Sequence, residues 1–171
     1  IERERLATWL TQRQIDNPRW IAGLADGCPG RALSLAEGEA ETWREQRDEL
    51  LTVLGGSMTD VFKYSERLTK GDRGTWTVRA ERMLDALARV VRDALVVAGG
   101  GSEDALYNAD RLPVVRAWAD ALGVAGSERV SQAIDKARQE LAAYVNGRLL
   151  FDALLSAVIA ELGGARRAAA Q

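Results

Sequence analysis

Apolar residues recur at helical spacing along almost the whole chain, and no segment alternates between apolar and polar residues as a strand does. The longest such segment spans 76–98 and has charged residues opposite one apolar stripe, which consists of Ala80, Met83, Leu84, Leu87, Val91, Ala94 and Leu95. Further helices are predicted over 2–10, 43–54, 58–68, 112–122, 127–145 and 146–162. In the helix over 127–145 the predicted inward residues are Val130, Ala133, Ile134, Ala137, Leu141 and Tyr144. The pattern predicts an all-α protein built around a helical bundle.

Proline and glycine mark the predicted helix ends. Asn17-Pro18 and Cys28-Pro29 are typical helix starts, with Asn17 as a capping residue, and Gly38 closes the second of these short helices. Three brief helices in so short a stretch make a unit with little stability of its own. We therefore predict a small N-terminal unit over 1–38, a helical bundle over 39–164 and a disordered tail over 165–171. Within the bundle, 99–102 predicts a flexible connection.

The helix predicted after Asn146 carries more apolar residues than one buried stripe requires. At about 100° per residue, its large side chains leave mainly Arg148, Asp152, Ser156 and Glu161 for water. A central helix enclosed by its own domain explains this excess, and so does a helix that also meets another subunit, since an obligate interface resembles a core cut in half. As candidate subunit-interface residues we take Leu150, Phe151, Leu154, Leu155 and Val158.

The composition excludes several kinds of chemistry. The 171 residues include no histidine, so no Ser-His-Asp or Cys-His nucleophile system can be assembled. Cys28 is the only cysteine, which excludes an internal disulfide and a four-thiolate zinc site and fits a cytoplasmic protein. The glycines at 99–101 lack the lysine that a phosphate-binding P-loop needs, and a net charge of −2 argues against a strongly electrostatic grip on nucleic acid. We expect no catalytic residue, no cofactor and no metal.

Two further features carry little chemistry. The acidic pairs Glu39/Glu41 and Glu103/Asp104 lie beside predicted loops and outside any apolar setting, so we interpret them as solvated surface. No apolar run approaches the roughly 20 residues of a membrane span, and we expect no membrane contact.

Two segments resemble a known family. Gly27-Cys28-Pro29-Gly30-Arg31-Ala32-Leu33 resembles the G-S-P-G-R-A-L segment in the lid of bacterial delta-prime clamp-loader subunits. Val145-Asn146-Gly147-Arg148-Leu149-Leu150 resembles the V-N-P-R-L-L segment that opens their terminal helix. Their order and separation also match, so the resemblance covers nearly the whole chain. Cys28 stands where the family has serine. Gly147 stands where it has proline, which we expect to loosen the helix start.

The resemblance implies an assembly role. Residues 1–38 would be the end of an AAA+ lid and the rest a collar domain, through which five subunits assemble into a ring that loads the sliding clamp onto primed DNA. The chain would lack the family's N-terminal nucleotide-binding domain, as its start at Ile1 rather than methionine also suggests. The implied partners are the other clamp-loader subunits and, indirectly, the sliding clamp and primed DNA, with no small-molecule substrate. The lid motif residues are Gly27, Pro29, Gly30 and Arg31.

Three alternatives remain open. The first is the collar of a tau/gamma ATPase subunit, but the corresponding segment there is G-S-L-R-D-A-L. Gly30 occupies the position of its phosphate-sensing arginine and cannot supply a guanidinium. The second is an unrelated helical regulatory domain, which predicts a closed apolar pocket with a few convergent polar groups. A small-molecule enzyme is the third and least favoured, because no acid–base constellation is apparent.

Overall fold

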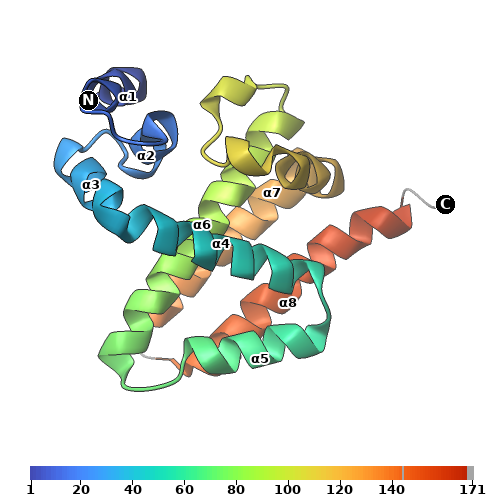
Figure 1. The fold of residues 1–171 in the computed structure, drawn as a ribbon. Helices are drawn as coiled ribbons and strands as arrows, with labels where there is room; N and C mark the ends of the chain where they lie inside the picture. The colour runs from blue at the N-terminus through green and yellow to red at the C-terminus, as the bar shows by residue number, and fades with distance from the viewer. Residues whose placement is uncertain (144, 169–171) are drawn as a thin grey trace.

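The computed structural model describes the backbone of residues 1–143 and 145–168, and the side chains of these residues up to 163. The described chain is helical and contains no strand (Figure 1), as the apolar periodicity predicts. A π-helical turn occupies Leu35–Glu39, and 3-10 turns occupy Glu103–Ala105 and Ala109–Arg111. The α-helices in chain order are α1 (Arg3–Gln12), α2 (Pro18–Leu24), α3 (Pro29–Ser34), α4 (Ala40–Gly55), α5 (Met58–Leu68), α6 (Arg73–Ala98), α7 (Leu112–Ala142) and α8 (Gly147–Ala168).

The helices α5 and α8 begin where the sequence predicts, and local hydrogen bonds explain why. The Ser57 side chain accepts from the backbone N–H of Asp60, whose carboxylate accepts in return from the Ser57 N–H, so α5 starts with a capping box. At α8, the Asn146 side-chain oxygen accepts from the Leu149 N–H at 3.2 Å, which confirms the predicted cap.

The helix break predicted between 112–122 and 127–145 is confirmed, whereas the predicted end of the last helix is wrong. Both predicted helices lie within α7, which has a kink at Gly123, where φ is 59° and ψ is −169°. The last helix does not end at 163–164: α8 continues to Ala168, so 165–168 is helical rather than a disordered tail. Residues 169–171 of that predicted tail, and the predicted inward position of Tyr144, lie outside the described residues.

The N-terminal region also differs from its prediction. Pro18 is the first residue of α2 as expected, but Asn17 adopts a left-handed backbone with φ of 52° and its side chain makes no capping hydrogen bond. Gly38, predicted to close the short helix that Cys28-Pro29 opens, lies at a kink with φ of 126°. Across this kink α3, the π-helical turn and α4 follow one another as one arm (Figure 1). Glycine adopts that conformation without the steric cost that a Cβ would add.

Two apolar clusters hold the chain together. The larger cluster contains residues of every helix from α4 through α8 and is centred on α6. The predicted apolar stripe of α6 is buried, apart from Leu95, which is half-buried. The smaller one joins α1, α2 and α3, and extends through Leu35 to Ala40 at the start of α4. Trp43 packs against both clusters. The clusters therefore meet close to residue 38, although the division into a lid end and a collar stays a prediction.

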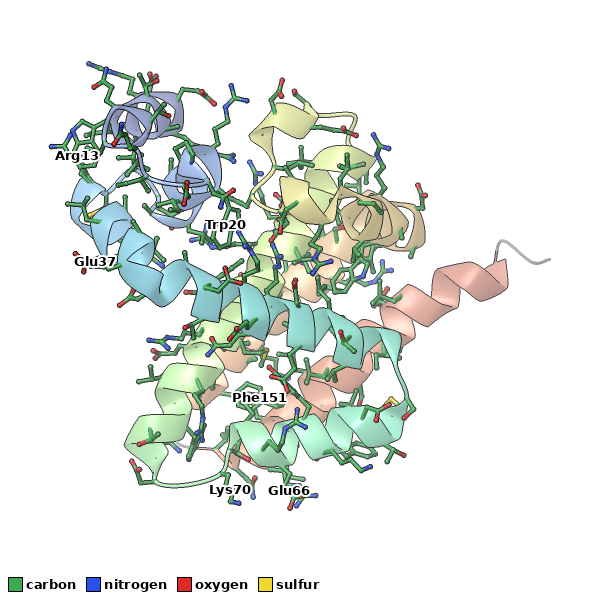
Figure 2. All side chains as sticks on the ribbon, in the orientation of Figure 1. Arg13, Trp20, Glu37, Glu66, Lys70 and Phe151 are labelled. Atoms are coloured by element: carbon green, nitrogen blue, oxygen red, sulfur yellow. The ribbon has the colours of Figure 1, made fainter. Side chains whose placement is uncertain are left out.

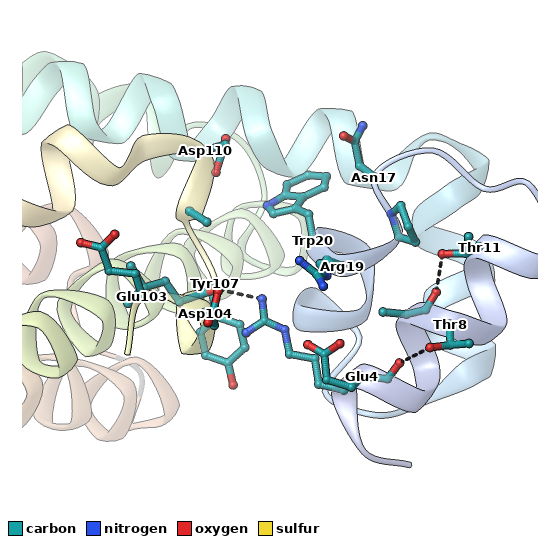
Figure 3. Close-up of a pocket in the computed structure, with 15 residues that line it drawn as sticks. Glu4, Thr8, Thr11, Asn17, Arg19, Trp20, Glu103, Asp104, Tyr107 and Asp110 are labelled. Atoms are coloured by element: carbon teal, nitrogen blue, oxygen red, sulfur yellow. Dashed lines mark hydrogen bonds between the residues drawn. The ribbon is translucent and has the colours of Figure 1, made fainter. Parts of the chain in front are cut away.

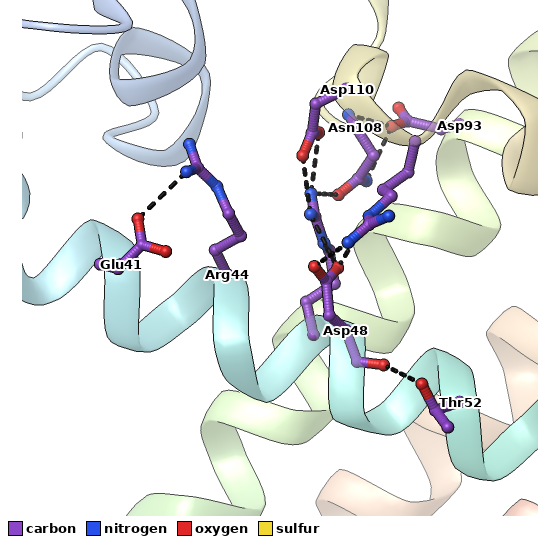
Figure 4. A network of polar contacts seen from close by, with 9 residues as sticks. Glu41, Arg44, Asp48, Thr52, Asp93, Asn108 and Asp110 are labelled. Carbon is purple, nitrogen blue, oxygen red and sulfur yellow. Dashed lines mark hydrogen bonds and ion pairs between the residues drawn. The ribbon is translucent and has the colours of Figure 1, made fainter.

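A buried carboxylate anchors the segment that follows α6 (Figure 4). Asp93 is 0% exposed, on the buried side of α6. It accepts hydrogen bonds from the Tyr107 N–H at 3.1 Å, the Asn108 N–H at 2.7 Å and the Asn108 side-chain amide at 2.8 Å. A carboxylate in this position requires such partners, because an unpaired buried charge is costly. The connection predicted to be flexible at 99–102 therefore leads into a segment that is tied to the bundle.

Arg47, a buried arginine of α4, extends this hydrogen-bond network. Arg47 is 0% exposed and donates to both carboxylate oxygens of Asp110 at 2.8 and 2.7 Å, and to the side-chain oxygen of Asn108 at 3.2 Å. Its Nε donates to one carboxylate oxygen of Asp48 at 2.9 Å, and Arg111 donates to both oxygens of that carboxylate. Partial burial raises the pKa of Asp48, but the hydrogen bonds and charges of Arg111 and Arg47 outweigh this effect and lower the pKa below 3.8.

Candidate interaction surface

The five side chains predicted to form a subunit interface lie inside this chain's own core. Figure 2 shows Phe151 in the interior of the bundle. The exposed fractions are 7% for Leu150, 0% for Phe151, 5% for Leu154, 0% for Leu155 and 0% for Val158. The interface prediction is therefore wrong for these residues, because α4, α5 and α7 already cover the inner face of α8. The alternative explanation, a central helix buried by its own domain, accounts for them.

The outer face of α8 is exposed and apolar. Leu149 is 65% exposed, the largest exposure of any large apolar side chain after Ile1. Ala153, Ala157 and Ala160 follow it at helical spacing and are also exposed. Beside them, a groove of about 160 Å³ runs between α7 and α8, lined by Ala133, Lys136, Ala137, Glu140, Leu150, Ala153, Leu154 and Ala157. The small side chains leave room for a neighbouring element to approach the α8 backbone closely.

Two exposed apolar side chains lie on α5, which packs against α8. Met58 is 38% and Phe62 43% exposed, one helical turn apart. Glu66, a turn further along α5, pairs with Arg148 of α8 at 3.4 Å. We define the α5–α8 surface as Met58, Phe62, Leu149, Ala153, Ala157 and Ala160.

The predicted lid motif forms an exposed helix start. Pro29 is the first residue of α3, where its missing N–H costs nothing. The carbonyl of Gly27 accepts from the N-terminal ammonium of Ile1 at 2.9 Å, and Gly30 has open space where a side chain would be. The guanidinium of Arg31 is half-exposed and lies 3.7 Å from the Asp26 carboxylate. These polar contacts of the motif therefore stay within the N-terminal unit, residues 1–38.

Gly147 occupies a position where the side chain of a larger residue would crowd the ring of Trp76. It is buried at the start of α8, and a Cβ added there would lie 2.6 Å from the ring of Trp76. This glycine permits the start of α8 to pack closely against Trp76 of α6, and the expected loosening of the helix start stays a prediction.

We predict that Gly147→Ala lowers the free energy of unfolding by about 1–3 kcal/mol, because either the Trp76 ring or the start of α8 must shift. Urea denaturation followed by circular dichroism measures the change. Gly55→Ala is the matched control, since a Cβ at Gly55 meets no atom within 4 Å. Equal stability of the two variants would contradict the packing role of Gly147.

A cleft of about 490 Å³ separates α1 and α2 from the segment 103–110 (Figure 3). Its apolar lining includes Trp20, Leu106 and Tyr107. Its charged lining residues are Arg3, Glu4, Arg19, Glu103, Asp104 and Asp110. The regulatory-domain alternative predicts a closed and mainly apolar pocket, and this mixed, charged lining does not favour it.

The acidic pairs and the cysteine singled out in the sequence have surface positions in the structure. Glu41 pairs with Arg44 at 3.0 Å and Glu103 with Arg116, both on the surface, and Cys28 is exposed. Among the residues whose placement is described, no three acidic or cysteine side chains gather as metal ligands. No helix in the described part of the chain is long and apolar enough to cross a membrane.

Comparison of the chain with protein-family models, with curated proteins and with solved structures finds no match. The functional interpretation therefore depends on the two sequence motifs and on the surface geometry.

Proposed function

We propose that this chain is a non-catalytic assembly region of a bacterial clamp-loader subunit of the delta-prime type, comprising the end of a lid and a collar domain. The observation that carries the proposal is the placement of the two family-like motifs. Each one opens a helix: Pro29 begins α3, and Asn146 caps α8. An all-helical bundle lies between them, as a collar requires.

The α5–α8 surface supports an assembly role. The exposed α8 positions Leu149, Ala153, Ala157 and Ala160 carry no charge, so a partner that covers them removes little hydration from polar groups. Leu149 and Phe62 supply the large apolar side chains that anchor interfaces. The ion pair Arg148–Glu66 joins the two helices with side chains 51% and 64% exposed, and can supply polar contacts to a partner.

In this role the chain holds neighbouring subunits in a ring and performs no reaction itself. It would serve the loading of the sliding clamp onto primed DNA in replication and work in the cytoplasm. The delta-prime type is favoured over tau/gamma because Gly30 stands where the ATPase relatives carry their nucleotide-sensing arginine.

Charge insertion on the α5–α8 surface tests the proposal. We expect Leu149→Asp and Phe62→Asp each to weaken capture of the chain by the other clamp-loader subunits by at least about tenfold, since an unpaired carboxylate would be buried in the interface. Capture is measured by surface plasmon resonance with immobilised partner subunits.

Val78→Asp serves as the control, because Val78 is exposed to 49% on α6 and lies outside the α5–α8 surface. All three variants should keep the helical circular dichroism of the unmodified chain. If Leu149→Asp and Phe62→Asp bind as tightly as Val78→Asp, this surface does not mediate assembly.

A further inference from the structure

The N-terminal unit, residues 1–38, is attached to the bundle at two separated places. At one of them the backbone arm from α3 to α4 passes through Gly38, whose φ of 126° breaks the helical geometry. A Cβ at Gly38 would meet nothing within 4 Å, so the chain has open space around this residue. Close by, the rings of Trp20 and Trp43 meet edge to face, with centroids 6.0 Å apart.

The second attachment consists of hydrogen bonds from two arginines, and those of Arg3 lie at the cleft of Figure 3. Arg3 of α1 donates to the carbonyls of Ala105 at 3.2 Å and Leu106 at 2.7 Å. Arg89 of α6 donates in the opposite direction, to the carbonyl of Gly23 at 3.1 Å and to the Asp26 carboxylate at 2.7 Å. Each unit thus contributes one arginine to the other.

Tyr107 lies between these two arginines. Its ring centroid is 5.4 Å from the guanidinium carbon of Arg3 and 4.8 Å from that of Arg89. A Cβ added to Gly23 would lie 3.1 Å from the Tyr107 ring, so α2 approaches the ring closely. We call Tyr107, Arg3 and Arg89, with the carbonyls and the carboxylate that they bind, the Tyr107 clasp.

The clasp differs in kind from the two apolar cores. It is polar, and the Asp26 side chain is 49% exposed to water. Salt and water weaken such contacts much more than they weaken a buried apolar core. The two cores meet at Trp43, beside Gly38, and the clasp adds a small polar contact away from that point. Units joined by a small polar interface are expected to move relative to each other.

We propose that the Tyr107 clasp is a releasable latch and that Gly38 is the hinge about which the N-terminal unit swings when the latch opens. The closed state has the arginine–carbonyl bonds described above. In the open state water replaces these bonds, while the contacts of Trp20 and Trp43 beside the hinge persist. In the proposed clamp-loader role, this motion changes the angle between lid and collar. The latch itself depends only on the structure.

Distance measurement between two spin labels tests the latch, and the chain provides one labelling site. Cys28 is its only cysteine, is exposed and belongs to the N-terminal unit. The second label goes on Lys136→Cys in α7, where the native side chain is 74% exposed. We expect pulsed electron paramagnetic resonance to give one narrow distance distribution for the labelled protein with the clasp intact.

The Tyr107→Ala/Arg89→Ala variant should add a second distance population of at least about 10%, the level of a detectable minor state. Arg116→Ala is the control, because Arg116 pairs with Glu103 in the same segment but has no bond to the N-terminal unit. If the double variant loses helicity, Asp26→Asn, which removes only the ionic part of the clasp, replaces it. A clasp variant with the distribution of the control overturns the proposal, as does a broad distribution with the clasp intact.

Discussion

Phe151→Ala is expected to lower the free energy of unfolding by about 3–5 kcal/mol, because removing most of a buried aromatic side chain loses its transfer free energy and leaves a cavity. Phe151 is 0% exposed and lies in the larger apolar cluster, where α8 meets the rest of the bundle. Chemical denaturation monitored by circular dichroism measures this loss.

Leu149→Ala, two residues away on the same helix, is the matched control. Leu149 is 65% exposed, so its truncation should change stability by no more than about 0.5 kcal/mol. The pair separates the inner face of α8, which holds the fold, from the outer face, which is free to bind a partner. Similar losses for both variants would show that this division of α8 is wrong.

Arg47→Ala is expected to cost about 3 kcal/mol of stability, near the lower end of the range for breaking a buried ion pair. The variant leaves the Asp110 carboxylate without its bidentate partner and the side-chain oxygen of Asn108 without its donor. We expect a stability loss near the lower end of that range because the Asp110 side chain is 38% exposed and water partly replaces the lost bonds. Thermal and chemical unfolding at neutral pH measure the effect.

The control is Arg116→Ala, which removes a surface pair whose side chains are 57% and 45% exposed and should cost less than about 1 kcal/mol. Acid gives a second check. The pKa of Asp48 is lowered in the folded chain, so its stabilising contribution is present above the ordinary value of 3.8 and is lost as the pH falls through the lower folded pKa. The difference between wild type and Arg47→Ala should therefore shrink in acid. A gap that stays constant with pH would count against an ionic network.

Local sequence signals predict much of the helical framework. The helical spacing of apolar residues over 58–68 predicts α5 with both ends correct. The long apolar stripe of α6 is buried almost as predicted. In both cases neighbouring residues along the chain decide the structure, so periodicity suffices.

The features that the sequence did not reveal depend on contacts between distant segments. Arg47 looks like a surface residue of α4, because arginine is seldom fully buried, and its partner Asp110 lies 63 residues away. The sequence gives only a weak sign that Asp93 is buried: it lies with Arg92 inside the apolar run of Val90, Val91 and Ala94. Its partners in the segment after α6 could not be predicted from periodicity.

The candidate surface shows the same limit. The apolar excess of α8 left two explanations open, burial by its own domain and contact with another subunit, and composition alone does not tell which residues face the chain's own core. The structure assigns Phe151 and its neighbours to the core, and leaves Leu149 and the alanines outside. The assembly proposal therefore moves from the inner face of α8 to its outer face.

The proposal that this chain holds proteins together is tested by sedimentation velocity. In this experiment the chain is mixed with the other subunits of a bacterial clamp loader. We predict that the chain alone sediments as a folded species and that the mixture contains a faster species that includes the chain. Independent sedimentation of the chain at concentrations well above those at which the other subunits assemble would contradict the account.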